Sequence, residues 1–117
     1  MSFIESIAND EHLAPLLATY LAANSFFTDD LNNLVPRVDE CDRNLFFNTR
    51  KLSSKIELLI YRAVDGKPIN VLLFSDYIKR YWLSLRYFYM SVGEEVYKRR
   101  VDNILCYANS LDLSDFN

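Results

Sequence analysis

Residues 75–91 have the sequence SDYIKRYWLSLRYFYMS, with six aromatic rings and three basic side chains within seventeen positions. Such a mixture suits a surface that binds single-stranded nucleic acid, because bases stack on rings while phosphates contact cations. It equally suits the buried helix of a small core. The choice depends on whether rings and cations share one face of the helix.

A helical wheel places the rings and the cations on different faces. At about 100° per residue from Val71, most rings and large aliphatic side chains fall within an arc of about 140°. Lys79, Arg80 and Arg86 fall on the opposite side. The stretch is therefore predicted to be the core helix of the protein. Its buried arc would consist of Phe74, Tyr77, Ile78, Tyr81, Trp82, Leu85, Phe88 and Tyr89.

The basic side of this helix also carries Leu72, Leu83, Tyr87 and Met90, so it is too apolar to be purely solvated. We expect this side to pack within the chain. The alternative is a contact with a second copy or with another protein, because interfaces are enriched in Tyr, Met and Arg.

Further helices are predicted upstream of this stretch. Apolar residues from Leu13 to Leu21 recur with the i, i+3, i+4 spacing of one helical stripe. A second helix is expected from a cap at Asp42 to about Ala63. Gly66, just before Pro68, would end it in the left-handed conformation.

Start signals also frame the core helix and the segment that follows it. Asn70 is placed to cap the core helix, and Ser91 and Glu94 have the spacing of a capping box that would start a final helix. The segment INVLLF at 69–74 is β-prone, but a single strand would have no pairing partner within the chain. An α+β fold is therefore the less favoured alternative.

These segments predict one all-α domain over residues 1–117, a compact bundle of four to five helices. The fifth helix would be a short one over residues 2–9. Two glycines and three prolines in 117 residues are too few for a sandwich or barrel with frequent tight turns. An acidic connection at about 25–42 and a tail at about 110–117 are expected to be irregular.

The tail alternates Leu111, Leu113 and Phe116 with Asp112 and Asp115. It either folds back on the bundle or serves as a short linear motif for a groove on another protein. We favour the first, because Leu111 continues the apolar stripe of the last helix.

Few residues are suited to catalysis or metal binding. His12 is the only histidine, and Cys41 and Cys106 are two isolated cysteines, which leaves too few ligands or bases for most such sites. Gly66 and Gly93 stand alone, so no glycine-rich loop can cradle a phosphate. We therefore expect no enzyme activity, no metal and no cofactor.

The sequence also carries expectations about location. No basic residue precedes Arg37 and no long apolar run follows the first methionine, unlike a secretion signal. No apolar run approaches the roughly 20 residues that a bilayer requires. The expected location is the cytoplasm, with no membrane contact.

Charge is distributed unevenly along the chain. Residues 1–48 carry eight acidic and two basic side chains, a net −6, whereas residues 49–102 carry six acidic and eleven basic ones, a net +5. The last fifteen residues contribute −2, so the whole chain has a net charge of −3. Such an asymmetry can steer a charged partner.

A binding site for a basic protein is predicted in the acidic connection. Two rings that we expect to be exposed lie among carboxylates there, and acidic residues around an aromatic anchor suit a basic partner. The predicted protein-binding residues are Phe26, Phe27, Asp29, Asp30, Asp39, Glu40 and Asp42.

The first functional hypothesis is a small protein that binds and neutralises a basic protein, as an immunity protein or antitoxin does with a nuclease toxin. The alternative is a helical subunit of a homo-oligomer or larger assembly, which would use the side of the core helix that carries Tyr87. A nucleic-acid-associated protein is a third hypothesis, and it is disfavoured because no recognised nucleic-acid motif occurs. It would use Lys79, Arg80, Arg86 and Lys98–Arg100.

Overall fold

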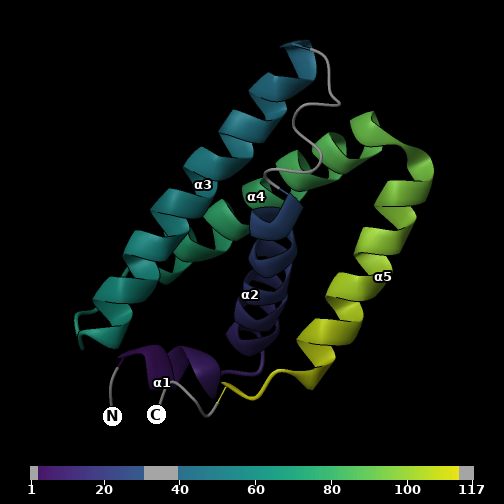
Figure 1. Ribbon diagram of the computed structural model, residues 1–117. Helices are drawn as coiled ribbons and strands as arrows, with labels where there is room; N and C mark the ends of the chain where they lie inside the picture. Colours follow the sequence, from purple (N-terminus) through teal and green to yellow (C-terminus); the bar gives the residue numbers. More distant parts are fainter. Residues whose placement is uncertain (1–2, 31–39, 114–117) are drawn as a thin grey trace.

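The computed structural model describes residues 3–30 and 40–113 (Figure 1). These residues form five helices and no strand, which confirms the all-α prediction; the segment INVLLF leads into a helix instead of a strand. The helices are α1 (Phe3–Ala8), α2 (Leu13–Asp30), α3 (Glu40–Val64), α4 (Val71–Val92) and α5 (Glu94–Ser110).

The five helices form an elongated bundle of 45 × 25 × 21 Å. Figure 1 shows α3 and α4 as two long helices that run in opposite directions, with α2 in the centre and α5 beside it. α3 packs chiefly against α4, and α2 packs chiefly against α5. The short α1 contacts both α2 and α3. This arrangement leaves one long side of α4 facing away from the other helices.

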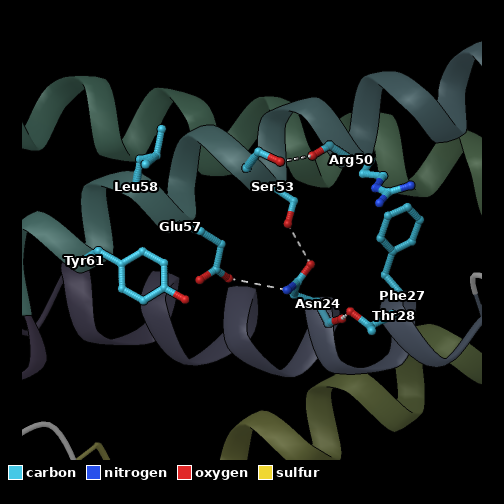
Figure 2. Close-up of a pocket in the computed structure, with 9 residues that line it drawn as sticks. Asn24, Phe27, Thr28, Arg50, Ser53, Glu57, Leu58 and Tyr61 are labelled. Carbon is cyan, nitrogen blue, oxygen red and sulfur yellow. Dashed lines mark hydrogen bonds between the residues drawn. The ribbon is translucent and has the colours of Figure 1, made fainter.

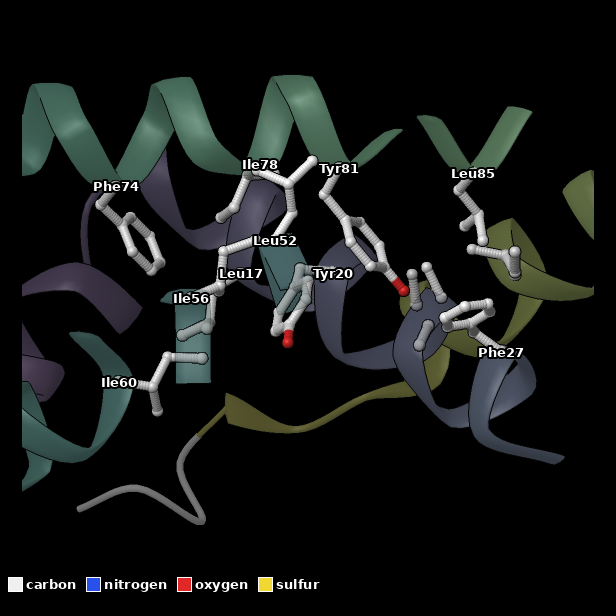
Figure 3. Close-up of a cluster of buried hydrophobic side chains, with 14 of the residues drawn as sticks. Leu17, Tyr20, Phe27, Leu52, Ile56, Ile60, Phe74, Ile78, Tyr81 and Leu85 are labelled. Carbon is white, nitrogen blue, oxygen red and sulfur yellow. The ribbon is translucent and has the colours of Figure 1, made fainter. Parts of the chain in front are cut away.

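The inner side of α4 forms the spine of the core, as the helical wheel predicts. Figure 3 shows Tyr81 of α4 meeting Tyr20 of α2 in the interior, and their rings pack edge to face with centroids 5.0 Å apart. Tyr77 and Trp82 are half-buried at the margin of this side. Each large apolar side chain that is fully buried contributes about 1.5–3 kcal/mol of transfer free energy. The fully buried members from α4 are Phe74, Ile78, Tyr81, Leu85, Phe88 and Tyr89.

The acidic connection is shorter than the sequence predicts. Residues 25–30, expected to be irregular, continue α2 as helix because Phe27 enters the core and Asp30 is held in a buried ion pair. α3 begins at Glu40, ahead of the cap that we expected at Asp42. Residues 31–39 lie outside the described part of the chain.

The turn between α3 and α4 follows the sequence signals. Gly66 adopts φ +84°, in the left-handed region that favours glycine. The amide of Lys67 donates to the carbonyl of Arg62 at 2.9 Å, which closes the helix end. At the start of α4, Asn70 Oδ1 accepts a hydrogen bond from the Leu73 amide at 3.1 Å, so the predicted cap is confirmed.

The predicted capping box at the start of α5 is wrong. α4 continues through Ser91 to Val92, and the Ser91 hydroxyl donates back to the carbonyl of Phe88 at 2.6 Å. Gly93 alone separates α4 from α5, and its amide donates to the carbonyl of Tyr89. The two helices therefore meet at a one-residue joint.

The start of the tail folds back on the bundle. Leu111 and Leu113 are partly buried and pack against the core, in a shallow depression that also involves Pro15 and Ala18 of α2. The expected fold-back is thus confirmed as far as Leu113, whereas residues 114–117, with Asp115 and Phe116, lie outside the described part.

Candidate functional site

The two rings of the predicted acidic site are not the exposed anchors that we expected. Phe27 is only 3% exposed and packs against Phe46 and Phe88 in the core, so its assignment as a surface ring is wrong. Phe26 is half-buried, with its ring edge to face against Tyr107 and beneath the guanidinium of Arg100. Both rings therefore serve packing between helices.

Asp30 is likewise removed from the surface. Its side chain is 2% exposed, and it accepts hydrogen bonds at 2.7 Å from both the Tyr89 hydroxyl and Arg100 Nε. This contact raises the pKa of Arg100, through the hydrogen bond with Asp30. Burial, followed by the hydrogen bond to Asp30, raises the pKa of Tyr89. The three side chains tie the end of α2 to α4 and α5.

The other four predicted residues are placed as follows. Asp29 is exposed at the end of α2. The backbone positions of Glu40 and Asp42 lie in the first turn of α3, and Asp39 lies outside the described residues. Among the predicted members whose side chains are described, Asp29 is thus the one exposed carboxylate.

A groove of about 510 Å³ lies between α2 and α3. Figure 2 shows Asn24 of α2 between Ser53 and Glu57 of α3, with Tyr61 and Leu58 toward one end. Ser53 Oγ donates to Asn24 Oδ1 at 2.8 Å, and the Tyr20 hydroxyl donates to Glu57 Oε1 at 2.8 Å.

The polar floor of this groove is satisfied from within the protein. Throughout the described residues, no buried side-chain nitrogen or oxygen lacks a hydrogen-bond partner. Groups that already bond one another offer a ligand little to gain, because a ligand must replace those bonds. The groove is therefore better explained as a polar seam that aligns α2 with α3.

The outer side of α4 presents a different surface. Leu83, Tyr87 and Met90 are 53%, 58% and 47% exposed. With Tyr97 of α5 and Arg86 they line a cavity of about 280 Å³. We call Leu83, Tyr87, Met90 and Tyr97 the docking face.

The expectation that this side of α4 packs within the chain is wrong. Leu72, about three turns before Leu83 on α4, is 82% exposed as well. The bundle needs only the inner arc of α4, because α2, α3 and α5 together cover that arc. The outer apolar residues therefore remain on the surface.

A second cavity continues the docking face toward α3. This basic groove, of about 390 Å³, lies between α3 and α4 and shares Leu83 and Tyr87 with the docking face. Lys51, Lys55 and Arg80 line it. Among the described residues, no carboxylate lines either of the two cavities.

The cations around these cavities have neighbours that orient them. Arg80 pairs with Asp76 at 3.0 Å, one turn away on the exposed surface of α4. The ammonium group of Lys55 lies 5.5 Å from the ring centre of Tyr77, and the guanidinium of Arg86 lies 5.9 Å from that of Tyr97. Asp76 thus offsets the charge of Arg80, whereas Lys51 and Lys55 of the groove have no carboxylate partner among the described residues.

Half of the cations proposed for nucleic-acid binding are paired with a carboxylate. Lys98 pairs with Glu94 at 3.2 Å, and Arg100 is held by Asp30. With the Arg80 pair, three of the six cations are matched by a carboxylate. They do not form one free basic stripe.

Sequence reasoning identified Leu83, Tyr87 and Met90 of the docking face but missed Tyr97, Lys51 and Lys55. The i, i+4 spacing of Lys51 and Lys55 places both on one face of α3, and that signal was available. Nothing local indicates that this face lies beside Leu83 and Tyr87, since that is a property of the α3–α4 packing.

The described residues contain neither a metal-binding cluster nor a membrane-spanning helix. Within residues 3–30 and 40–113, no three His, Cys, Asp or Glu side chains gather in a way that could hold a metal ion. No helix in the same ranges has both the length and the apolar character needed to cross a bilayer. No family model, no curated protein and no solved structure matches this chain.

Proposed function

We propose that this chain is a non-catalytic protein-binding protein that engages its partner through the docking face on α4. One observation carries the proposal: Leu83, Tyr87 and Met90, at i, i+4 and i+7 on one helix, are each about half exposed around a cavity.

The composition of this surface supports binding to a protein. Contiguous apolar surface of this kind on a soluble domain marks an interaction site more often than isolated exposed residues do. Tyr, Met and Arg, all present here, are enriched at the cores of protein interfaces. The Tyr87 ring beside a cavity is the type of residue that dominates binding energy.

The experiment compares two double variants that make the same chemical change on different helices. Leu83→Ser with Tyr87→Ser alters the docking face. Leu58→Ser with Tyr61→Ser alters α3, where the two residues are 65% and 66% exposed and therefore provide a matched control. Neither pair belongs to the core, so both proteins should keep the wild-type circular dichroism spectrum and melting temperature.

Each protein is then tagged and purified from its native host, and its co-purifying proteins are quantified. The proposal requires a stoichiometric partner that is lost with the α4 variant and retained with the α3 variant. Retention of every specific partner by a folded α4 variant would refute it.

A further inference from the structure

The docking face and the basic groove form one continuous surface, because Leu83 and Tyr87 line both cavities. Lys51, Lys55 and Arg80 stand along one part of it, and Arg86 stands at the other. The groove between α2 and α3 is different, since it contains both Arg50 and Glu57. The described walls of these two cavities thus carry cations and no carboxylate. Asp76 offsets Arg80, which leaves Lys51, Lys55 and Arg86 as the cations of this surface, although the whole chain has a net charge of −3.

Building on the proposed function, we infer that the partner segment is an acidic amphipathic helix, which lays its apolar stripe on the docking face and its carboxylates against Lys51, Lys55 and Arg86. Complementary charge steers such a segment to the surface, and a buried apolar stripe holds it there.

The spacing of the apolar residues suits a helix. Leu83 and Met90 are seven residues apart, about 10 Å along α4 at 1.5 Å per residue. Two turns of an incoming helix match this length, with apolar residues at i, i+3 or i+4, and i+7. The depression between α3 and α4 would receive it as a third helix packed on an existing pair.

A second copy of the chain fits the same surface poorly. In a two-fold contact the same patch meets itself. Lys51, Lys55 and Arg86 of one copy would then face the same three cations of the other, and no described carboxylate in the cavity walls would balance them. Like charges brought together in this way oppose association.

Nucleic acid is also a weaker fit than an acidic helix. Single strands are held by rings that stack on successive bases, with cations placed for the phosphates. The centre of this surface includes the aliphatic side chains Leu83 and Met90, which offer neither stacking nor base-edge hydrogen bonds.

The test is a selection from a displayed library of helical peptides of about 18 residues, long enough for five turns, with surface positions randomised between acidic, basic and neutral residues. The full chain is the bait. Selected peptides are synthesised, and their affinities are measured by fluorescence anisotropy for the wild type and for four variants. These are Leu83→Ser with Tyr87→Ser, Lys51→Glu with Lys55→Glu, Leu58→Ser with Tyr61→Ser, and Arg62→Glu with Lys67→Glu.

We expect enrichment of peptides with net negative charge and an apolar stripe. The Leu83→Ser, Tyr87→Ser variant and the Lys51→Glu, Lys55→Glu variant should weaken their binding by at least about tenfold, as loss of a binding hot spot does. The other two variants are controls and should leave it within about twofold. Raising salt from about 0.1 M to about 1 M should also weaken binding, because the screening length falls from about 10 Å to about 3 Å.

Three results of the peptide selection would overturn the inference. These are enrichment of basic or neutral peptides, no enrichment at all, or acidic peptides whose affinity changes in neither the Leu83→Ser, Tyr87→Ser variant nor the Lys51→Glu, Lys55→Glu variant. Equal competition by a single-stranded oligonucleotide at the same sites would also overturn it, in favour of nucleic acid. The peptide test can fail while the Leu83→Ser, Tyr87→Ser variant still loses its partner in the co-purification experiment. In that case the proposed function holds and only the acidic-helix inference fails.

Discussion

Arg100 of α5 donates two hydrogen bonds to Asp30, the last residue of α2, although the two residues lie seventy positions apart in the sequence. Asp30 is almost fully buried, and Arg100 is about one-quarter exposed. A carboxylate at the C-terminal end of a helix is unfavourable because it faces the negative end of the helix dipole. The arginine removes that penalty and fixes the angle between α2 and α5.

Arg100→Met should destabilise the fold by about 3 kcal/mol, since removing one partner leaves the other charge buried without compensation. The double variant Asp30→Leu with Arg100→Met should recover part of that loss, because it leaves neither charge unpaired. Urea unfolding monitored by circular dichroism measures both values. Arg99→Met, on the exposed neighbour of Arg100, is the control and should change stability by less than about 0.5 kcal/mol. Equal effects at positions 99 and 100 would contradict the role of the pair.

Alkaline pH should unfold the protein in one step with ionisation of its buried tyrosines. Burial raises the pKa of Tyr20, Tyr81 and Tyr89 well above the value of about 10 for an unfolded tyrosine. Their contribution to stability is therefore complete below pH of about 10 and is lost as pH rises above it, because the unfolded state releases protons that the folded state retains.

Tyrosinate absorbance and far-ultraviolet circular dichroism, followed together against pH, test this expectation. Three of the eight tyrosines should ionise only as the helical signal disappears. Ionisation of all eight before any loss of helix would contradict it.

Tyr20→Phe should lower the free energy of unfolding by about 1–2 kcal/mol. It removes the hydroxyl group that donates a hydrogen bond to Glu57 between α2 and α3. Tyr61→Phe makes the same chemical change on an exposed ring of the same groove. Thermal melts of the two variants should therefore differ, with the Tyr61 variant close to wild type. Identical melting temperatures would show that the seam contributes little.

The isolated chain should remain a monomer. The inferred partner is acidic, and a symmetric contact through the docking face would bring Lys51, Lys55 and Arg86 of one copy close to the same cations of the other. Light scattering over a wide concentration range should return a constant mass near 13.7 kDa. A dimer that dissociates when Leu83 and Tyr87 are changed to serine would instead support the homo-oligomer hypothesis.

The inhibitor hypothesis can be tested without disturbing the buried ion pair. Asp29, Asp39, Glu40 and Asp42 are changed to their amides while Asp30 is kept, because Asp30 supports the fold. If the chain neutralises a basic protein, this variant should lose strongly basic co-purifying proteins that the Leu83→Ser, Tyr87→Ser variant retains. Loss of the same partners in both variants, or in neither, would count against a separate acidic site.

Much of the fold could be predicted because its signals are local. The apolar arc of α4, the cap at Asn70 and the left-handed Gly66 each depend on neighbours within a few residues. The end of α2 could not be predicted in this way. Phe27 and the Asp29–Asp30 pair resemble the start of a loop, and their helical state depends on distant contacts with Phe88, Tyr89 and Arg100.

The candidate site likewise has a part that local sequence signals predict and a part that depends on how the helices pack. Periodicity placed Leu83, Tyr87 and Met90 on the outer side of α4, but it could not tell whether another helix covers them. The capping box predicted from Ser91 and Glu94 does not form, because α4 continues to Val92 and Ser91 is part of that helix. Lys51 and Lys55 joined the surface only through the packing of α3 against α4.

The one-residue joint at Gly93 gives the docking face a mechanical property. Met90 lies before the joint and Tyr97 lies beyond it, so a partner that covers both residues would brace α4 against α5. Thermal bending between the two helices would then be damped. We expect this stiffening to slow amide hydrogen exchange on both sides of Gly93, including at backbone amides that the partner does not contact.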